Sequence, residues 1–166
     1  MSNSNTVIRN ATPADIPLVM ELIRALAEYE KLSDRVTATP DLIEQALFGP
    51  RPMAECLIAE SDNCAAGFAL FFHNFSTFIG KPGIYLEDLF VKPEFRGCGL
   101  GKALLARLAQ IALERDCGRM EWAVVDWNEP SIKFYRALGA ESLDDWEIFR
   151  LKGQALVALA MTHTSV

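Results

Sequence analysis

Apolar residues recur at helical spacing near the start of the chain. They lie three or four residues apart on one stripe, which consists of Leu18, Val19, Leu22, Ile23 and Leu26. A stripe of this period predicts an amphipathic helix. Residues 12–15, Thr-Pro-Ala-Asp, mark its start, with threonine as the N-cap and proline in the first turn. Residues 39–41, Thr-Pro-Asp, give the same signal for a shorter helix, which should end at Gly49-Pro50.

Short apolar runs separated by turn residues occupy the middle of the chain, as is typical of strands. The predicted strands are residues 7–9, 56–59, 65–72, 84–91, 122–125 and 148–151. Two further amphipathic helices are expected at 99–117 and 130–138. The order β-α-α-β-β-β-α-β-α-β predicts an α/β fold of mixed α+β layers, with an antiparallel front and a strand–helix–strand back half.

Composition narrows the class of protein. The 166 residues, 51% of them hydrophobic, predict a single soluble domain spanning 1–166. The 22 acidic and 16 basic residues give a net charge of −6, which disfavours non-specific nucleic-acid binding and mildly favours a cationic partner. No uncharged apolar run approaches the roughly 20 residues that span a membrane. The four cysteines and two histidines lack metal-ligand spacing, so we expect no metal, and the polar N-terminus favours a cytoplasmic location.

The most informative segment is residues 91–102, Val-Lys-Pro-Glu-Phe-Arg-Gly-Cys-Gly-Leu-Gly-Lys. It leads from a predicted strand through a glycine-rich turn into a predicted helix. Glycines allow the backbone to approach a ligand, and the N–H groups at a helix N-terminus bind anions such as a pyrophosphate. Arg96 would add a charge-assisted contact. A tight turn without a ligand is the alternative interpretation.

Two common phosphate-binding motifs do not fit this segment. A P-loop requires Ser or Thr after Gly101-Lys102, where Ala103 stands, and a glycine at the position of Arg96. A dinucleotide-binding fingerprint requires a third glycine where Lys102 stands.

The remaining pattern, Arg-Gly-x-Gly-x-Gly after Val-x-Pro-x-Phe, resembles the acetyl-CoA loop of the GNAT superfamily. Residues 85–91, Tyr-Leu-Glu-Asp-Leu-Phe-Val, and 126–135, Asp-Trp-Asn-Glu-Pro-Ser-Ile-Lys-Phe-Tyr, extend the resemblance to the spermidine/spermine (diamine) N-acetyltransferase family. The resemblance implies a central mixed sheet with helices on both faces, acetyl-CoA as cosubstrate, and a homodimer. It also implies direct acetyl transfer to a small amine in a ternary complex.

Within that family, residues 26–34 and 76–80 resemble the thialysine N-acetyltransferase branch. Ser76 stands where the polyamine branch has an acidic residue, which favours a thialysine-like amino acid or short diamine over a long polyamine. Two alternatives remain at this point: a GNAT enzyme acting on a protein or another amine, and a non-catalytic coenzyme A sensor.

Glu87 and Asp88 are adjacent in an otherwise apolar predicted strand. Alternation sends neighbouring side chains to opposite faces, so at least one carboxylate should enter a semi-buried region and require a partner. A structural ion pair is one interpretation. With the resemblance, Glu87 is the first choice for binding the ammonium and accepting its proton, and Asp88 the second.

The resemblance also implies roles for other residues. The hydroxyl of Tyr135 would protonate the leaving thiolate, although the residues alone favour a packed aromatic. Cys98 is read as loop filler, because no partner base accompanies it. Tyr29, Glu30, Glu87, Asp88, Ser76 and Asp145 would line the amine site. The coenzyme would contact Leu89, Phe90, Val91, Arg96, Gly97, Cys98, Gly99, Leu100, Gly101, Lys102, Asn128, Ser131 and Tyr135.

Overall fold

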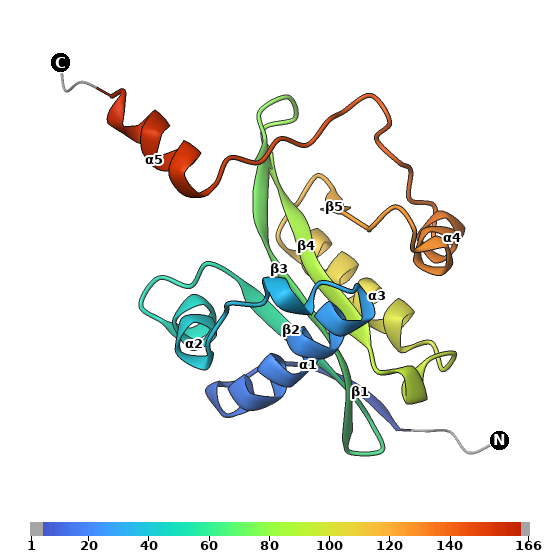
Figure 1. The fold of residues 1–166 in the computed structure, drawn as a ribbon. Coiled ribbons are helices and arrows are strands. Elements are labelled where there is room, and N and C mark those ends of the chain that lie inside the picture. Colours follow the sequence, from blue (N-terminus) through green and yellow to red (C-terminus); the bar gives the residue numbers. More distant parts are fainter. Residues whose placement is uncertain (1–4, 164–166) are drawn as a thin grey trace. The chain divides into compact units, whose positions relative to one another are not determined.

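The computed structural model describes residues 5–163 and divides the chain into two compact units, residues 1–125 and 126–166 (Figure 1). The sequence-based expectation of a single domain therefore stays a prediction.

The first unit contains a five-stranded sheet in the order β1-β2-β3-β4-β5. Its strands are β1 (Thr6–Asn10), β2 (Glu55–Ser61), β3 (Cys64–Ser76), β4 (Lys81–Val91) and β5 (Met120–Trp122). Neighbouring strands are antiparallel except β4 and β5, which are parallel. A parallel pair needs a crossover, and α3 (Leu100–Glu114) supplies it. The mixed sheet predicted from sequence is confirmed.

Helices cover both faces of this sheet. Figure 1 shows α1 (Ile16–Tyr29) and α2 (Pro40–Phe48) on one side and α3 on the other. Short 3-10 turns join them to the strands: η1 (Pro13–Asp15), η2 (Ser33–Arg35) and η3 (Pro93–Phe95). Thr39 accepts a hydrogen bond from the backbone N–H of Leu42 at the start of α2, as its N-cap position predicts.

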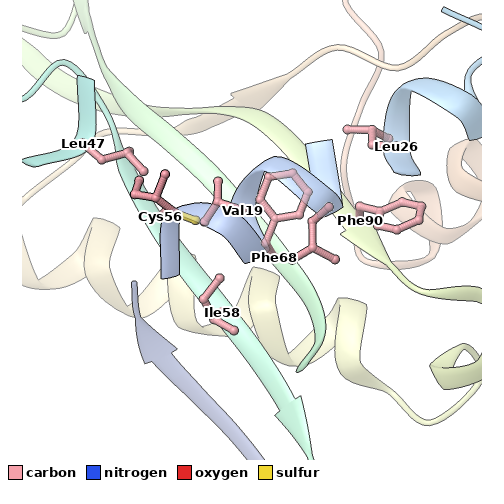
Figure 2. Close-up of a cluster of buried hydrophobic side chains, with 9 residues drawn as sticks. Val19, Leu26, Leu47, Cys56, Ile58, Phe68 and Phe90 are labelled. Atoms are coloured by element: carbon pink, nitrogen blue, oxygen red, sulfur yellow. The ribbon is translucent and has the colours of Figure 1, made fainter. Parts of the chain in front are cut away.

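A hydrophobic core fills the space between α1, α2 and the sheet. Figure 2 shows Leu26 and Phe90 toward one end of this cluster and Leu47 and Cys56 toward the other. Phe68 and Val19 are fully buried between them. Burying each such apolar side chain contributes about 1.5–3 kcal/mol, so the stripe predicted on α1 is the main attachment of this helix to the sheet.

Ion pairs join β1 to β2 and to the turn that follows β1. Arg9 on β1 pairs with Asp15 at 2.8 Å and with Glu60 on β2 at 2.7 Å. Asp15 also accepts a hydrogen bond from the backbone N–H of Thr12, completing a capping box. The hydrogen bond from Arg9 holds the pKa of Asp15 well below its usual range.

The second unit contains α4 (Glu129–Ala137) and α5 (Gly153–Met161). It differs from expectation in one strand and one helix. Residues 148–151 form no strand: Ile148 and Phe149 are 81% and 88% exposed and have no strand partner in the described part of the chain. Helix α5 was not predicted, although its alanines and leucines are strong helix formers. In the first unit, the strand expected at 122–125 is instead Met120–Trp122. None of the helices within residues 5–163 is long and apolar enough to span a membrane.

Candidate active site

Three carboxylates gather between β4 and the end of α1, and we call Glu30, Glu87 and Asp88 the acidic cluster. Burial, with the charges of Glu87 and Glu30, raises the pKa of Asp88 to about 6. Burial also raises the pKa of Glu30. A semi-buried carboxylate whose pKa is raised by neighbouring carboxylates, as for Asp88, binds a cation readily, because an ammonium relieves the repulsion.

A β-bulge in β4 places Asp88. The pairing with β3 shifts so that Phe71 faces Leu86 and Leu70 faces Asp88, while Glu87 has no partner on β3. Leu70 and Phe71 are consecutive and lie on opposite faces, so Leu86 and Asp88 also lie on opposite faces although they are two residues apart. Simple alternation does not hold through this bulge, which re-aims side chains.

The face that Asp88 shares is the face covered by α1. Leu70, its pairing partner, packs against the hydrophobic core beneath α1. Cys56, the next partner across the sheet, belongs to the same core. Burial raises the pKa of the Cys56 thiol to about 12, and the charge of Asp88 contributes to that rise. Asp88 thus lies at the edge of an apolar region, which explains its weak acidity.

Glu30 reaches the cluster because α1 ends there. Tyr29 is the last helical residue, and Glu30 is the C-cap, with its backbone N–H donating to the carbonyl of Leu26. Lys31 adopts a positive φ of 60° and turns the chain away. The structure thus brings together Glu30, Glu87 and Asp88, three of the residues that the sequence analysis assigned to the amine site.

The connection from β4 to α3 has the geometry of an anion site. Gly97 and Gly99 adopt φ values of +80° and +85°, which disfavour any side chain. A Cβ built on either glycine would meet no other atom within 4 Å, so the backbone here is open to a ligand. Gly99 is the N-cap of α3, and no side chain caps this helix. Its first backbone N–H groups therefore remain available to a phosphate, and the segment fits the pyrophosphate of a coenzyme.

The side chain of Arg96, at the start of this turn, lies over Tyr29. Its Cζ is 4.6 Å from the centre of the Tyr29 ring and 5.6 Å from that of Phe90. Its Nε donates a 2.9 Å hydrogen bond to the carbonyl of Val91. Whether the guanidinium also contacts the coenzyme stays a prediction.

Ser76 lies away from the acidic cluster along the sheet. It is 7% exposed at the end of β3, where it pairs with Lys81, whereas Asp88 pairs with Leu70. Six residues of strand separate Leu70 from Ser76, which is about 20 Å at about 3.3 Å per residue. The structure therefore does not bring Ser76 to Asp88 within one chain, and its role in the amine site stays a prediction.

The second unit carries the remaining candidates. Asn128 is 5% exposed and caps α4, accepting a 3.3 Å hydrogen bond from the backbone N–H of Ser131. Asn128 therefore has a structural role as the N-cap of α4, and Ser131 supplies the backbone N–H that it caps. Tyr135 lies on α4 with its ring centre 5.4 Å from that of Phe134. Asp145 is exposed in a segment without regular structure. The proposed contacts of these residues with coenzyme or amine stay predictions.

A family model described as the acetyltransferase (GNAT) family matches residues 19–140, which is most of the chain. The matched range includes the acidic cluster and the glycine-rich turn. The chain belongs to the GNAT family. As a GNAT acetyltransferase, it has the fold and the enzyme class that the glycine-rich turn and its flanking motifs imply.

Several characterised relatives resemble this GNAT protein over nearly its whole length. A thialysine N-epsilon-acetyltransferase of Bos taurus is 39% identical over 165 residues, covering 93% of this chain and 96% of the relative. An L-ornithine N5-acetyltransferase of Arabidopsis thaliana is 32% identical, covering 92% of this chain and 86% of the relative. Both relatives are named for acetyl transfer to an amino acid that carries a side-chain amine.

Solved structures share the fold. An integron cassette protein from V. cholerae superimposes with a TM-score of 0.77 at 27% identity, covering 93% of this chain and 97% of that chain. An aminoglycoside N-acetyltransferase in complex with CoA gives a TM-score of 0.72 at 23% identity, covering 92% and 98%. These likenesses confirm the predicted GNAT fold.

Some contacts in this GNAT protein were not foreseen from sequence. Lys92 forms an ion pair with Glu21 on α1 at 2.8 Å. Both Arg96 and Lys92, from the connection between β4 and α3, therefore contact α1. Arg115 binds Glu55 through both terminal nitrogens, at 2.5 and 2.8 Å. No local pattern marks such pairs, because their partners are distant in the sequence. Among the described residues, no group of three or more His, Cys, Asp or Glu side chains is arranged to hold a metal ion.

Proposed function

We propose that this GNAT protein transfers an acetyl group from acetyl-CoA to the primary amine of a small molecule, a thialysine-like amino acid or a short diamine. The observation that carries the proposal is the acidic cluster in the same unit as a turn suited to pyrophosphate. The names of the relatives from Bos taurus and Arabidopsis thaliana support the same substrate class.

The acidic cluster would bind the substrate as an ammonium ion and help to deprotonate it. An alkylamine has a pKa near 10, so almost all of it is protonated at neutral pH. Asp88, with its pKa raised to about 6, is ionised at pH 7 yet basic enough to take part in proton transfer. This supports Asp88 as the proton acceptor, directly or through water, with Glu87 holding the charge. The sequence analysis had placed Glu87 first for both roles.

The coenzyme would lie along β4 and the turn that follows it. Backbone N–H groups of residues 96–102 would hold the pyrophosphate, and those of Leu89, Phe90 or Val91 the pantetheine arm and the thioester oxygen. Lys102 would add a positive charge on the first turn of α3. Acetyl-CoA supplies the activated acetyl group.

Transfer would be direct, within a ternary complex. The amine nitrogen attacks the thioester carbon, the new N–C bond forms and the C–S bond breaks. The proton lost by the ammonium goes to Asp88 or its water, and the hydroxyl of Tyr135 gives its proton to the departing thiolate. A phenol suits this step, since its pKa near 10 lies slightly above that of a thiol. The resemblance supports this role for Tyr135 and contacts of Asn128 and Ser131 with the coenzyme.

Substrate choice within the class would follow from the number of carboxylates. With serine at position 76, the chain has one acid fewer than the polyamine branch that it resembles. By this resemblance a single side-chain amine or short diamine would suit the site better than spermine, although Ser76 lies away from the acidic cluster within one chain. The family resemblance further supports a homodimer, in which Asp145, on a segment of the second unit, would contact the amine.

A thiol-release assay tests the proposal. Enzyme and acetyl-CoA are incubated with thialysine, lysine, ornithine, putrescine, spermidine, spermine or a lysine-containing peptide, and free coenzyme A thiol is followed. Cys64 and Cys98 are free and exposed, so a thiol reagent can reach them, and a blank of the same enzyme without amine is subtracted. We expect thialysine or a short diamine to give the highest kcat/KM. Thiol release with the peptide alone would show that the substrate is a protein and not a small amine. No release with any amine while coenzyme A still binds would establish a sensor instead.

A further inference from the structure

Arg96 occupies the space between the proposed coenzyme turn and the proposed amine site. Gly97, the first glycine of the turn, follows Arg96 in the chain. The Nε of Arg96 donates a hydrogen bond to the carbonyl of Val91. Its guanidinium lies against the ring of Tyr29, which ends α1, and near the ring of Phe90. One side chain thus contacts the end of β4, the core beneath α1 and the end of α1 itself.

The end of α1 needs such an attachment because of the charges around it. Glu30 follows Tyr29, and its charge and that of Glu87 both act on Asp88. Like charges in a semi-buried site repel one another, and this repulsion tends to push the end of α1 away from β4 when no ammonium is bound. The fully buried part of α1 ends at Leu26 and Ala27, and beyond them only the partly buried ring of Tyr29 packs against the core, so a contact to this ring adds to the attachment of the helix end.

We propose that Arg96 is a positioning residue for the amine: by stacking on Tyr29 it holds the Tyr29–Glu30 end of α1 against β4 and so keeps Glu30 beside Asp88. The inference rests on the proposed function, since it assigns the acidic cluster to the amine. It gives the side chain of Arg96 a role in amine affinity, where the sequence pattern alone indicated a contact with the coenzyme phosphate.

The chemistry of the contact requires arginine. A planar guanidinium can stack on an aromatic ring and donate from Nε at the same time, whereas an ammonium has neither the plane nor the fixed fork. Arg96→Lys therefore keeps the positive charge near the turn but loses the stack and the hydrogen bond to Val91. Nearby, Lys92 reaches the same helix through a simple ion pair with Glu21. Lys92→Gln is accordingly the matched control, since it removes a cation–α1 contact two turns before Tyr29.

Steady-state kinetics separate the two roles of the arginine. The planar stack and the hydrogen bond to Val91, which lysine cannot reproduce together, are expected to contribute about two- to fivefold, the size of an exposed cation–π contact. We expect Arg96→Lys to raise the KM for the amine about fivefold, while the KM for acetyl-CoA and kcat at saturating amine stay within about twofold. Lys92→Gln should leave the amine KM within about twofold of the wild type. A rise in the acetyl-CoA KM alone would overturn the proposal and make Arg96 a coenzyme contact.

A double-mutant cycle tests whether the effect passes through Tyr29. In a Tyr29→Leu background the ring is absent, so adding Arg96→Lys should change the amine KM by less than about 1.5-fold. In a Tyr29→Phe background the ring remains, so the same addition should still raise the amine KM about fivefold. Equal effects in both backgrounds would show that the guanidinium acts without Tyr29, against the proposal.

Hydrogen exchange without any substrate keeps this test distinct from the test of the function. Residues 26–32 should exchange about threefold to fivefold faster in Arg96→Lys and Tyr29→Leu than in the wild type, and at the wild-type rate in Lys92→Gln. Unchanged exchange in Arg96→Lys would refute the positioning role even if acetyl transfer is observed. Faster exchange in a protein that acetylates no amine would leave the attachment of α1 established and the proposed function refuted.

Discussion

Replacing Asp88 by asparagine should stabilise the protein at neutral pH. Burial and the neighbouring charges of Glu87 and Glu30 raise the pKa of Asp88 from 3.8 to about 6. Both the folded and the unfolded protein hold the proton below pH 3.8, so the carboxyl costs nothing there. As the pH rises from 4 to 6 the unfolded chain loses its proton first, and the free energy of unfolding falls. Above pH 6 the loss is complete.

The size of this loss follows from the two pKa values. A difference of about two units corresponds to about 3 kcal/mol at 1.36 kcal/mol per unit. An asparagine of nearly the same shape carries no charge, so Asp88→Asn should be more stable than the wild type by up to about 3 kcal/mol at pH 7, and by only about 0.5 kcal/mol at pH 4. The gain is smaller if the amide leaves a buried hydrogen-bond donor unpaired.

Urea unfolding of the full chain at pH 4, 5, 6, 7 and 8 measures this difference. Glu94→Gln serves as the control, because Glu94 is exposed on η3 and its replacement changes the net charge equally. The reasoning is refuted if Asp88→Asn is less stable than the wild type at pH 7, which would mean that an unseen cation partner stabilises the ionised form. A stability difference that does not shrink between pH 6 and pH 4 would also refute it.

Three other changes test separate parts of the site and fold. Tyr135→Phe should lower kcat about 100-fold, because it removes only the proton donor for the thiolate; an unchanged single-turnover rate would make Tyr135 a packing residue. Gly99→Ala should raise the acetyl-CoA KM at least tenfold and cost about 1 kcal/mol of stability in urea, since alanine is strained at a φ of +85°. Asp15→Asn should destabilise the protein by about 1–3 kcal/mol at pH 7, because Arg9 loses a charged partner. The pKa of Asp15 is lowered in the folded protein, so this stability is present above about pH 4 and is lost gradually as the pH falls further. In thermal melts the two proteins should therefore differ more at pH 7 than at pH 2.

The parts of the fold that sequence predicted well are those with local causes. The stripe of apolar residues on α1, the Thr-Pro starts of η1 and α2 and the glycine turn before α3 each depend on residues within a few positions of one another. The failure at residues 148–151 has the opposite origin. A strand exists only when another strand pairs with it, and an apolar run such as Ile148-Phe149 does not say whether a partner is present.

In the candidate site, too, features with a local cause were predictable from the sequence and features that depend on distant contacts were not. Adjacent polar residues at Glu87 and Asp88 interrupt the apolar pattern of β4, and this local signal marks the place of the bulge. The stack of Arg96 on Tyr29 joins residues far apart in the sequence, so no spacing could reveal it. Propensity and periodicity thus found the acids and the glycines, while the burial that raises the pKa of Asp88 came only from the packing of α1 on the sheet.

The acidic cluster has a consequence for turnover under the proposed function. The substrate enters as a cation and relieves the repulsion among Glu30, Glu87 and Asp88, so binding is favoured by the same electrostatic energy that destabilises the empty protein. Acetylation turns the amine into a neutral amide, and once Asp88 has passed the transferred proton on to solvent, this amide cannot relieve the repulsion. The cluster therefore binds substrate more strongly than product, and the cost in stability that Asp88 imposes is what drives product release. A cluster with fewer buried charges would give a more stable protein that discriminates less between the amine and its acetylated form.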